Sequence, residues 1–281
     1  MLRTRILTSL ILIPGFVAAL FLLPHRYWAL LMLAAMSIAM WEWAVMIKLN
    51  PPARVIYVLA SVAIGLALIF NASTTIQSGS QTFMVAWYML MGAALFWIVI
   101  APIWLITRCR VKNVWAMAMA GWVVIFPLWL ALSMLHIIGQ KILLMILMTV
   151  WIADSAAYFT GKRFGKHKLA PLISPGKTWE GVLGACLAVS VYGIFLCVFL
   201  DISHHYYQFW IIIGLWGITI ASIIGDLLES LVKRQAGVKD SGDLLPGHGG
   251  ILDRIDGLTA SLPLALSIIL PIWMVAQLPG N

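Results

Sequence analysis

The sequence predicts an all-α polytopic membrane protein with about nine transmembrane helices, a cytoplasmic N-terminus and a C-terminus outside. Two observations lead to this prediction. Of the 281 residues, 63% are hydrophobic and only 10% are charged, and the mean hydropathy is +1.00. The hydrophobic residues also form runs of about 20 residues, which is the length of helix that crosses a hydrocarbon core roughly 30 Å thick.

Each apolar run accounts for one expected helix. The first run follows Arg3 and Arg5, as in a signal peptide, but its length and its immediate continuation into a second run favour a retained anchor. The segment 71–82 carries no charge, which suits a loop outside the cell. The expected spans are residues 5–23, 27–47, 54–70, 83–106, 114–137, 141–160, 177–200, 207–232 and 257–277.

The basic residues set the expected orientation, because cytoplasmic loops of membrane proteins are enriched in Lys and Arg. With the N-terminus inside, 16 of the 18 basic residues are cytoplasmic, and only Arg26 and Lys141 fall outside. This topology and contact with an anionic leaflet explain the net charge of +8. The charge is therefore no argument for nucleic-acid binding. The three cysteines form no CxxC pair and are expected to be small apolar fillers.

The acidic residues divide the chain into two regions. Residues 1–140 are expected to hold about five helices that serve as scaffold and for lipid access, and Glu42 is the only acidic residue before position 150. A lone charge near a helix end most simply pairs with Lys48 or lies at the interface. Residues 141–281 contain the other acidic residues and are expected to form the catalytic region, with cytoplasmic loops at 161–177 and 233–256.

The first polar cluster runs from Asp154 to Gly181 and combines glycines with basic residues. Its stretch 174–178 leads into a helix, where free backbone N–H groups favour an anion. We expect Ser174, Lys177 and Thr178 to bind phosphate. The string resembles a P-loop only superficially, because position 171, where GxxxxGK[ST] requires its first glycine, is Pro171. A Walker-type ATPase is therefore excluded.

Two further clusters supply paired carboxylates. Asp226 and Glu229 are three residues apart on one expected helix, and Asp253 and Asp256 are three apart at the start of the next. Carboxylate oxygens of this kind suit Mg²⁺ rather than zinc. The alternative is that the first pair binds Lys233 and Arg234 on the following turn, and this is more plausible for Glu229 than for Asp226.

The polar residues around the second and third clusters resemble the signature of the phosphatidate cytidylyltransferases, also called CDP-diacylglycerol synthases. The resemblance covers 27 positions, 230–256, without a departure, and it extends to the stretch 154–181, to Gly225-Asp226 and to the many-helix architecture. The matching positions are Ser230, Lys233, Arg234, Lys239, Asp240, Gly242, Leu245, Pro246, His248, Gly249, Gly250, Ile251, Asp253, Arg254, Ile255 and Asp256.

The resemblance implies transfer of CMP from CTP to phosphatidic acid, giving CDP-diacylglycerol and pyrophosphate for phospholipid biosynthesis. It also implies Mg²⁺ and a second, monovalent cation such as K⁺, a homodimer, and a bacterial inner membrane with the active site on its cytoplasmic face. Carried over by position, the metal ligands are Asp226, Asp253 and Asp256, and the catalytic set adds Lys239, His248 and Arg254. The expected nucleotide or phosphate residues are Ser174, Lys177, Thr178, Lys233, Arg234, Lys239 and Arg254.

The reaction does not require a strong general base, because a phosphate monoester has its second pKa near 6 and is largely deprotonated at neutral pH. His248 is therefore less expected to act as one, and its role stays open between hydrogen bonding, proton transfer and holding the loop. Two other functions are also open. A CTP-dependent lipid kinase would transfer the γ-phosphoryl group, and a cation-coupled transporter would place its charges near the bilayer midplane.

Overall fold

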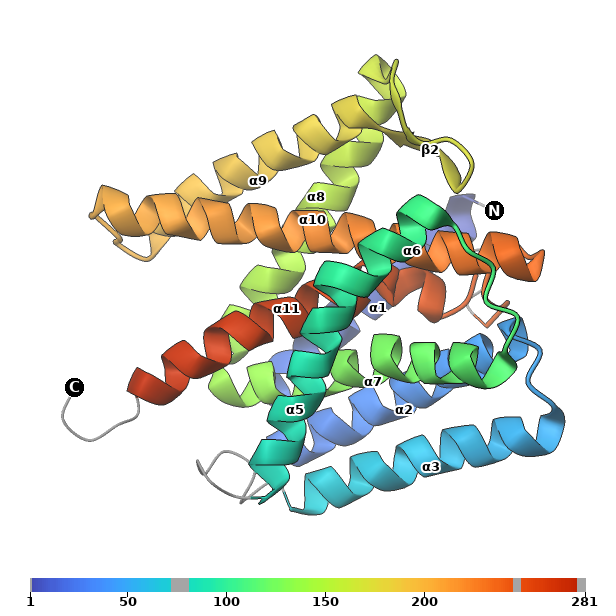
Figure 1. Ribbon diagram of the computed structural model, residues 1–281. Helices are drawn as coiled ribbons and strands as arrows, with labels where there is room; N and C mark the ends of the chain where they lie inside the picture. Colours follow the sequence, from blue (N-terminus) through green and yellow to red (C-terminus); the bar gives the residue numbers. More distant parts are fainter. Residues whose placement is uncertain (1, 72–80, 245–248, 277–281) are drawn as a thin grey trace.

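The computed structural model describes residues 2–71, 81–244 and 249–276 and is a bundle of long helices with one small hairpin (Figure 1). Two short strands, β1 (Lys168–Ala170) and β2 (Ser174–Thr178), pair antiparallel between α8 and α9. The helices are α1 (Leu2–Leu22), α2 (His25–Met46), α3 (Pro51–Phe70), α5 (Gln81–Leu95), the π-helical turn η1 (Phe96–Ile100), α6 (Ala101–Thr107), α7 (Val114–Ile138), α8 (Gln140–Phe164), α9 (Trp179–Phe199), α10 (His205–Ala236) and α11 (Leu252–Ala276).

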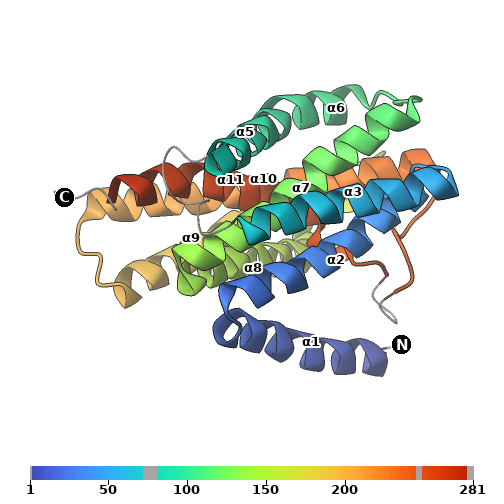
Figure 2. The same cartoon turned by 90° about the horizontal axis from the view of Figure 1, so that it is seen from below.

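The predicted polytopic all-α character is confirmed. Within the described residues, eight helical segments are long and apolar enough to span a membrane, and α5, η1 and α6 together make one of them. The described apolar part of α1, Ile13–Leu22, is shorter than the others. Figure 2 shows α1 at the edge of the bundle, beside α2.

Sequence signals explain where several helices begin and end. Asn50, followed by two prolines, caps α3 by accepting a hydrogen bond from the Ala53 amide at 2.9 Å. Asn113 caps α7 in the same way. At the other end of α10, Gly237 has a φ of 79°, the left-handed conformation that commonly stops a helix.

Tryptophan side chains join α2 to α7 in the core. The indole N–H groups of Trp28, Trp43 and Trp129 are buried and donate to backbone carbonyls on the opposite helix at 2.9–3.1 Å. Gly121 of α7 makes room for the ring of Trp43, because a Cβ at this position would overlap the indole. These bonds satisfy polar groups that are expensive to leave unpaired in an apolar interior.

The helices that carry the acidic residues lie side by side. Helix α9 lies along α8 and α10, and α10 lies along α11 (Figure 1). Helices α10 and α11 both reach further into the polar region than the apolar runs suggested, since α10 continues to Ala236 and α11 begins at Leu252. The connection between them is therefore shorter than the expected loop 233–256, and Lys233, Asp253 and Asp256 lie on helices.

Candidate active site

The phosphate-binding stretch predicted from sequence contacts the first acidic helix. Lys177 on β2 places its Nζ atom 2.6 Å from Oδ2 of Asp226 on α10, and both side chains are about a quarter to a third exposed. The other oxygen of Asp226 accepts a hydrogen bond from Ser230, one helical turn later. The ion pair is thus reachable from solvent, as a site for a charged substrate must be.

Strand β2 is held in place by Thr178 at its end. The Thr178 side chain is buried and accepts a hydrogen bond from the Gly181 amide at 3.1 Å, which caps the N-terminus of α9. Glycines at 161 and 165 leave space for this side chain, because a Cβ at either position would lie within 3 Å of its atoms. The sequence predicted a helix start here, and the structure adds the hairpin that aims Lys177 at α10.

Two more carboxylates belong to the same electrostatic neighbourhood. The charges of Asp226 and Lys177 act on both Asp154 of α8 and Asp256 of α11. Three helices and one hairpin therefore contribute ionisable groups to this place. Near it, the Ser222 hydroxyl of α10 is buried beside Asp154 and lies against Gly257.

A second group of charges lies one to two turns further along α10. The Lys233 ammonium is 2.8 Å from Oε2 of Glu229 and 2.6 Å from Oδ1 of Asp253, and all three side chains are at least 89% buried. The charge of Asp226 also acts on Glu229, so the charged residues around Lys177 and those around Lys233 form one continuous cluster. The pairing of Glu229 with Lys233, which the sequence offered as the alternative to a cation site, is present, and Lys233 lies between two carboxylates and does not project toward solvent as a nucleotide ligand would.

Asp253 organises the polar loop between α10 and α11. Its Oδ2 atom accepts hydrogen bonds from the Ser241 amide at 2.9 Å, the Ser241 hydroxyl at 3.0 Å and the Gly250 amide at 2.9 Å. Gly249 has a φ of 82°, and a Cβ on it would lie 2.7 Å from the same oxygen. A residue larger than glycine at 249 would therefore disturb both the backbone and the carboxylate.

Glu42 joins the N-terminal region to this loop. Its carboxylate is 5% exposed and accepts hydrogen bonds from the Ile251 amide at 3.0 Å, the Leu252 amide at 2.8 Å and the Ser241 hydroxyl at 3.1 Å. Two of these donors are amides at the start of α11, where a negative charge is stabilised. The expectation that Glu42 pairs with Lys48 is therefore wrong, because its carboxylate is buried and bound to these donors, and its position at the membrane interface stays a prediction.

The other predicted site residues are less constrained. Ser174 is half-buried on β2, while Arg234, Lys239 and Arg254 are exposed. His248 lies outside the described residues, and its predicted role stays a prediction.

Sequence reasoning left two contributors without a role in the site. Asp154 was noted only as the start of a polar stretch, although an ionisable residue within an apolar span marks a functional position by default. Glu42 carried a comparable signal, as the only acidic residue in the first 150 positions.

As the side chains stand, no three His, Cys, Asp or Glu residues in the part of the chain that the structure describes are arranged to coordinate one metal ion. The donor set nevertheless fits a hard cation. Asp226 pairs with Lys177, and Glu229 and Asp253 share Lys233, so the carboxylates of these ion pairs outnumber the ammonium groups. Mg²⁺ is commonly held by one or two carboxylates, with water and substrate phosphates completing its shell.

Comparisons with known proteins agree with this chemistry. A phosphatidate cytidylyltransferase of Haemophilus influenzae is 33% identical over 279 residues, covering 94% of this chain and 96% of the relative. One from Pseudomonas aeruginosa is 36% identical over 276 residues, covering 96% and 97%. One from Brucella suis is 36% identical over 233 residues, covering 74% and 82%. The sequence model of the cytidylyltransferase family matches residues 3–271, and the chain belongs to that family.

Proposed function

We propose that this protein is an enzyme that transfers CMP from CTP to phosphatidic acid and releases pyrophosphate. The family and the names of the relatives support this reaction class. The observation that carries the proposal is the contact between Lys177 and Asp226, 2.6 Å apart, because it joins a basic phosphate-binding hairpin to helices rich in carboxylates. A nucleotide triphosphate with its cation needs both kinds of group.

In this reaction an oxygen of the phosphatidate phosphate attacks the α-phosphorus of CTP. A new P–O bond forms, the bond between the α- and β-phosphates breaks, and pyrophosphate leaves. Two anionic reactants must approach each other, so fixed positive charge and positioning supply most of the catalysis. We propose that Lys177 on the hairpin binds a phosphate together with the half-buried Ser174, whereas the buried Thr178, which caps α9, holds the hairpin in place and does not contact the phosphate. The exposed Lys239 and Arg254 are the next candidates.

We assign the cation sites to the carboxylate cluster, which comprises Asp154, Asp226, Glu229, Asp253 and Asp256. Asp226, Asp253 and Asp256 are the proposed ligands of Mg²⁺ and of a monovalent cation such as K⁺, and Asp154 is added to them because it is an acidic residue within the apolar helix α8, beside Ser222 of α10. Lysine ammonium groups now lie against Asp226 and Asp253 at 2.6 Å, which supports a need for positive charge at both carboxylates. A bound divalent cation would screen the repulsion between the two phosphorylated reactants.

The proposal includes nine spans, a cytoplasmic N-terminus and an active site on the cytoplasmic face of a bacterial inner membrane. Two views support the orientation: α1 begins at the end of the bundle where α10 ends and α11 begins, and α11 ends at the opposite end (Figures 1 and 2). A homodimer, which the resemblance implies, belongs to the same proposal, and light scattering of the purified protein tests it.

The decisive experiment uses purified protein with Mg²⁺, phosphatidic acid and CTP labelled separately at the α and γ positions. We expect the α label to enter the lipid and the γ label to leave as pyrophosphate. Transfer of the γ label into lipid acceptors would instead show a lipid kinase. The absence of turnover with a panel of lipids, in protein shown to be folded, would overturn the enzyme assignment and favour a transporter.

A further inference from the structure

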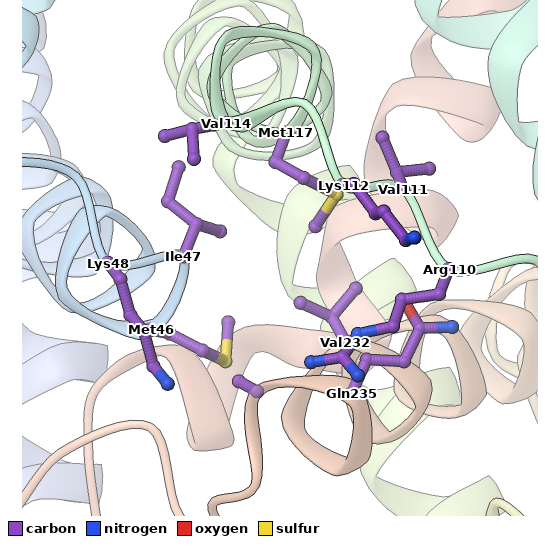
Figure 3. A pocket seen from close by; sticks show the side chains of 11 residues that line it. Met46, Ile47, Lys48, Arg110, Val111, Lys112, Val114, Met117, Val232 and Gln235 are labelled. Atoms are coloured by element: carbon purple, nitrogen blue, oxygen red, sulfur yellow. The ribbon is translucent and has the colours of Figure 1, made fainter.

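A cavity of about 420 Å³ lies beside the carboxylate cluster, between the end of α2, the segment joining α6 to α7, and the last turns of α10 (Figure 3). Most of its lining is apolar, and three of its side chains are basic. The lining residues are Met46, Ile47, Lys48, Arg110, Val111, Lys112, Val114, Met117, Val232, Gln235 and Ala236.

The charge of the cavity is entirely positive. Lys48 lines it just after the end of α2, and Arg110 and Lys112 line it from the opposite side (Figure 3). No carboxylate lines the cavity, and none of the three cations forms a salt bridge with a described residue. Three uncompensated cations around one cavity repel one another, so an anion bound among them is stabilised.

The segment that carries Arg110 and Lys112 is fixed by hydrogen bonds. The Gln235 side-chain amide donates to the Arg108 and Cys109 carbonyls at 3.3 and 3.2 Å, and the Trp104 indole donates to the Cys109 carbonyl at 2.9 Å. Arg108 has a φ of 51°, a conformation uncommon for a residue with a side chain. The basic side chains therefore project from an ordered support, which lowers the entropic cost of binding.

The residues that line the cavity favour some anionic ligands over others. The only uncharged polar side chain is that of Gln235, whose amide already bonds to backbone carbonyls, so the cavity offers little to recognise a nucleobase or a sugar. Its methionine and valine walls suit the glycerol and first methylene groups of a lipid. Three cations at the end of membrane-spanning helices suit a phosphate headgroup, because basic residues at the cytoplasmic interface attract anionic lipids.

This cavity is separate from the cation sites assigned above. Val232, Gln235 and Ala236 line it from one side of α10, whereas Lys233 on the same helix turns toward Glu229 and Asp253. Binding in the cavity does not require the transfer reaction, because none of its lining residues belongs to the carboxylate cluster or to the phosphate-binding hairpin.

We propose that Lys48, Arg110 and Lys112 bind the phosphate headgroup of an acidic phospholipid at a site distinct from the catalytic carboxylates. The phosphate of a diacyl phospholipid such as phosphatidylglycerol carries the charge that these side chains recognise, and the apolar walls contact the lipid below it. This site holds one lipid of the surrounding leaflet against the ends of α2, α7 and α10.

The test measures lipid binding by native mass spectrometry of the full-length protein in detergent. The ligands are dioctanoyl phosphatidylglycerol, dioctanoyl phosphatidylcholine, inorganic phosphate and tripolyphosphate. The test variant is Lys48→Gln/Arg110→Gln. Its matched control is Arg26→Gln/Lys141→Gln, which removes the same two residue types from exposed positions elsewhere.

We expect the wild-type protein to bind phosphatidylglycerol more tightly than phosphatidylcholine. The test variant should lose about tenfold or more in phosphatidylglycerol affinity, as expected for two cations near a lipid headgroup, while the control keeps it. Equal loss in both variants would show a nonspecific charge effect and would overturn the site. Competition by tripolyphosphate or inorganic phosphate at the lipid's own affinity would assign the cavity to a free phosphate and exclude the lipid.

A further variant separates binding from folding. If Lys48→Gln/Arg110→Gln does not elute as a monodisperse protein, Lys112→Gln is measured in its place, because Lys112 is exposed and its side chain has no ion pair with a described residue. Wild-type affinity for phosphatidylglycerol in a folded variant would contradict the proposal.

Discussion

At the scale of single residues, buried carboxylates in this protein have two different tasks. Asp226 is a third exposed and is paired with a lysine that solvent can reach. Glu42 is buried, and its oxygens accept hydrogen bonds from the Ser241 hydroxyl and from the Ile251 and Leu252 amides at the start of α11. The first arrangement can exchange partners with a substrate or cation, whereas the second holds the backbone in place.

Neutralising Asp226 tests the first task. We expect Asp226→Asn to lower kcat/KM for CMP transfer by about 100- to 1000-fold, because the cation that stabilises the charge of the reacting phosphates would lose a proposed ligand. The unfolding temperature should change little, since the side chain is 34% exposed. The measurement is steady-state kinetics with labelled CTP.

Asp243→Asn is the matched control for Asp226→Asn, because Asp243 is an exposed carboxylate of the polar loop. This control should keep wild-type kinetics. Full activity in the Asp226 variant would remove Asp226 from the proposed site.

Glu42→Gln tests the second task. Glutamine keeps the volume but replaces one acceptor oxygen with an NH₂ group, which would face donors at the start of α11. We expect the free energy of unfolding to fall by about 2–3 kcal/mol, the cost of losing hydrogen bonds to a buried charged group. Activity should fall as well, since the loop that contains Ser241 loses an anchor. Thermal unfolding and kcat/KM measure the two effects.

The control for Glu42 is Asp201→Asn, an exposed carboxylate in the connection between α9 and α10. If Glu42→Gln matched this control in both stability and activity, the carboxylate would not be needed to hold the loop.

At the scale of elements, the distance between α10 and α11 positions the acidic residues. Gly225 of α10 lies against the backbone of α11, because a Cβ added to it would lie 2.5 Å from the Asp256 carbonyl oxygen. The two helices therefore touch at the level where Asp226 and Asp256 leave them. The Asp256 carbonyl oxygen is part of the helix backbone, so it can make room for a Cβ at position 225 only if one helix shifts.

Gly225→Ala should consequently separate the two helices. We expect a loss of stability of about 1–3 kcal/mol from overpacking, with a fall in kcat as the carboxylates move apart. Gly217→Ala in the same helix is the matched control, because a Cβ there meets nothing within 4 Å. Alanine favours helix over glycine by about 1 kcal/mol, so the control should be neutral or slightly stabilising. Equal behaviour of the two variants in unfolding and kinetics would show that this contact does not set the site.

At the scale of the whole molecule, the N-terminal and C-terminal regions meet at one end of the bundle. Glu42 of α2 contacts Ser241, 199 residues later in the chain, and α2 also packs against α7 through three tryptophans. Helix α2 thus supports the loop before α11 as well as adding a span. The ends of α2, α7 and α10 that surround the basic cavity lie in the same part of the molecule.

The orientation of the whole bundle is tested with Cys109, an exposed residue after α6. In a Cys186→Ser/Cys197→Ser background, we expect a membrane-impermeant maleimide to label Cys109 in inside-out vesicles and not in intact cells, because the proposed topology places it in the cytoplasm. An added Asp201→Cys should be labelled in intact cells, as the outside control. The reverse pattern for the two cysteines would invert the topology.

Local patterns in the sequence predicted much of this protein. Hydropathy over about 20 residues identified the membrane class, and the concentration of carboxylates after position 150 identified α10 and α11 as helices of the candidate site. The spacing of three residues correctly placed Asp226 and Glu229 on one helix. The resemblance over 230–256 identified the family. All of these signals lie within short segments, where the chain's own period determines which residues are neighbours.

Only the tertiary structure decided which charges meet. Glu42 binds amides that lie 209 and 210 residues away, and Lys177 reaches Asp226 because the β1–β2 hairpin turns it toward α10. Lys233 is a nucleotide candidate by position in the sequence, yet the packing of α10 on α11 places it between two buried carboxylates. The physical reason is that pairing across helices depends on their rotation and separation, which steric contacts such as that at Gly225 determine and hydropathy does not encode.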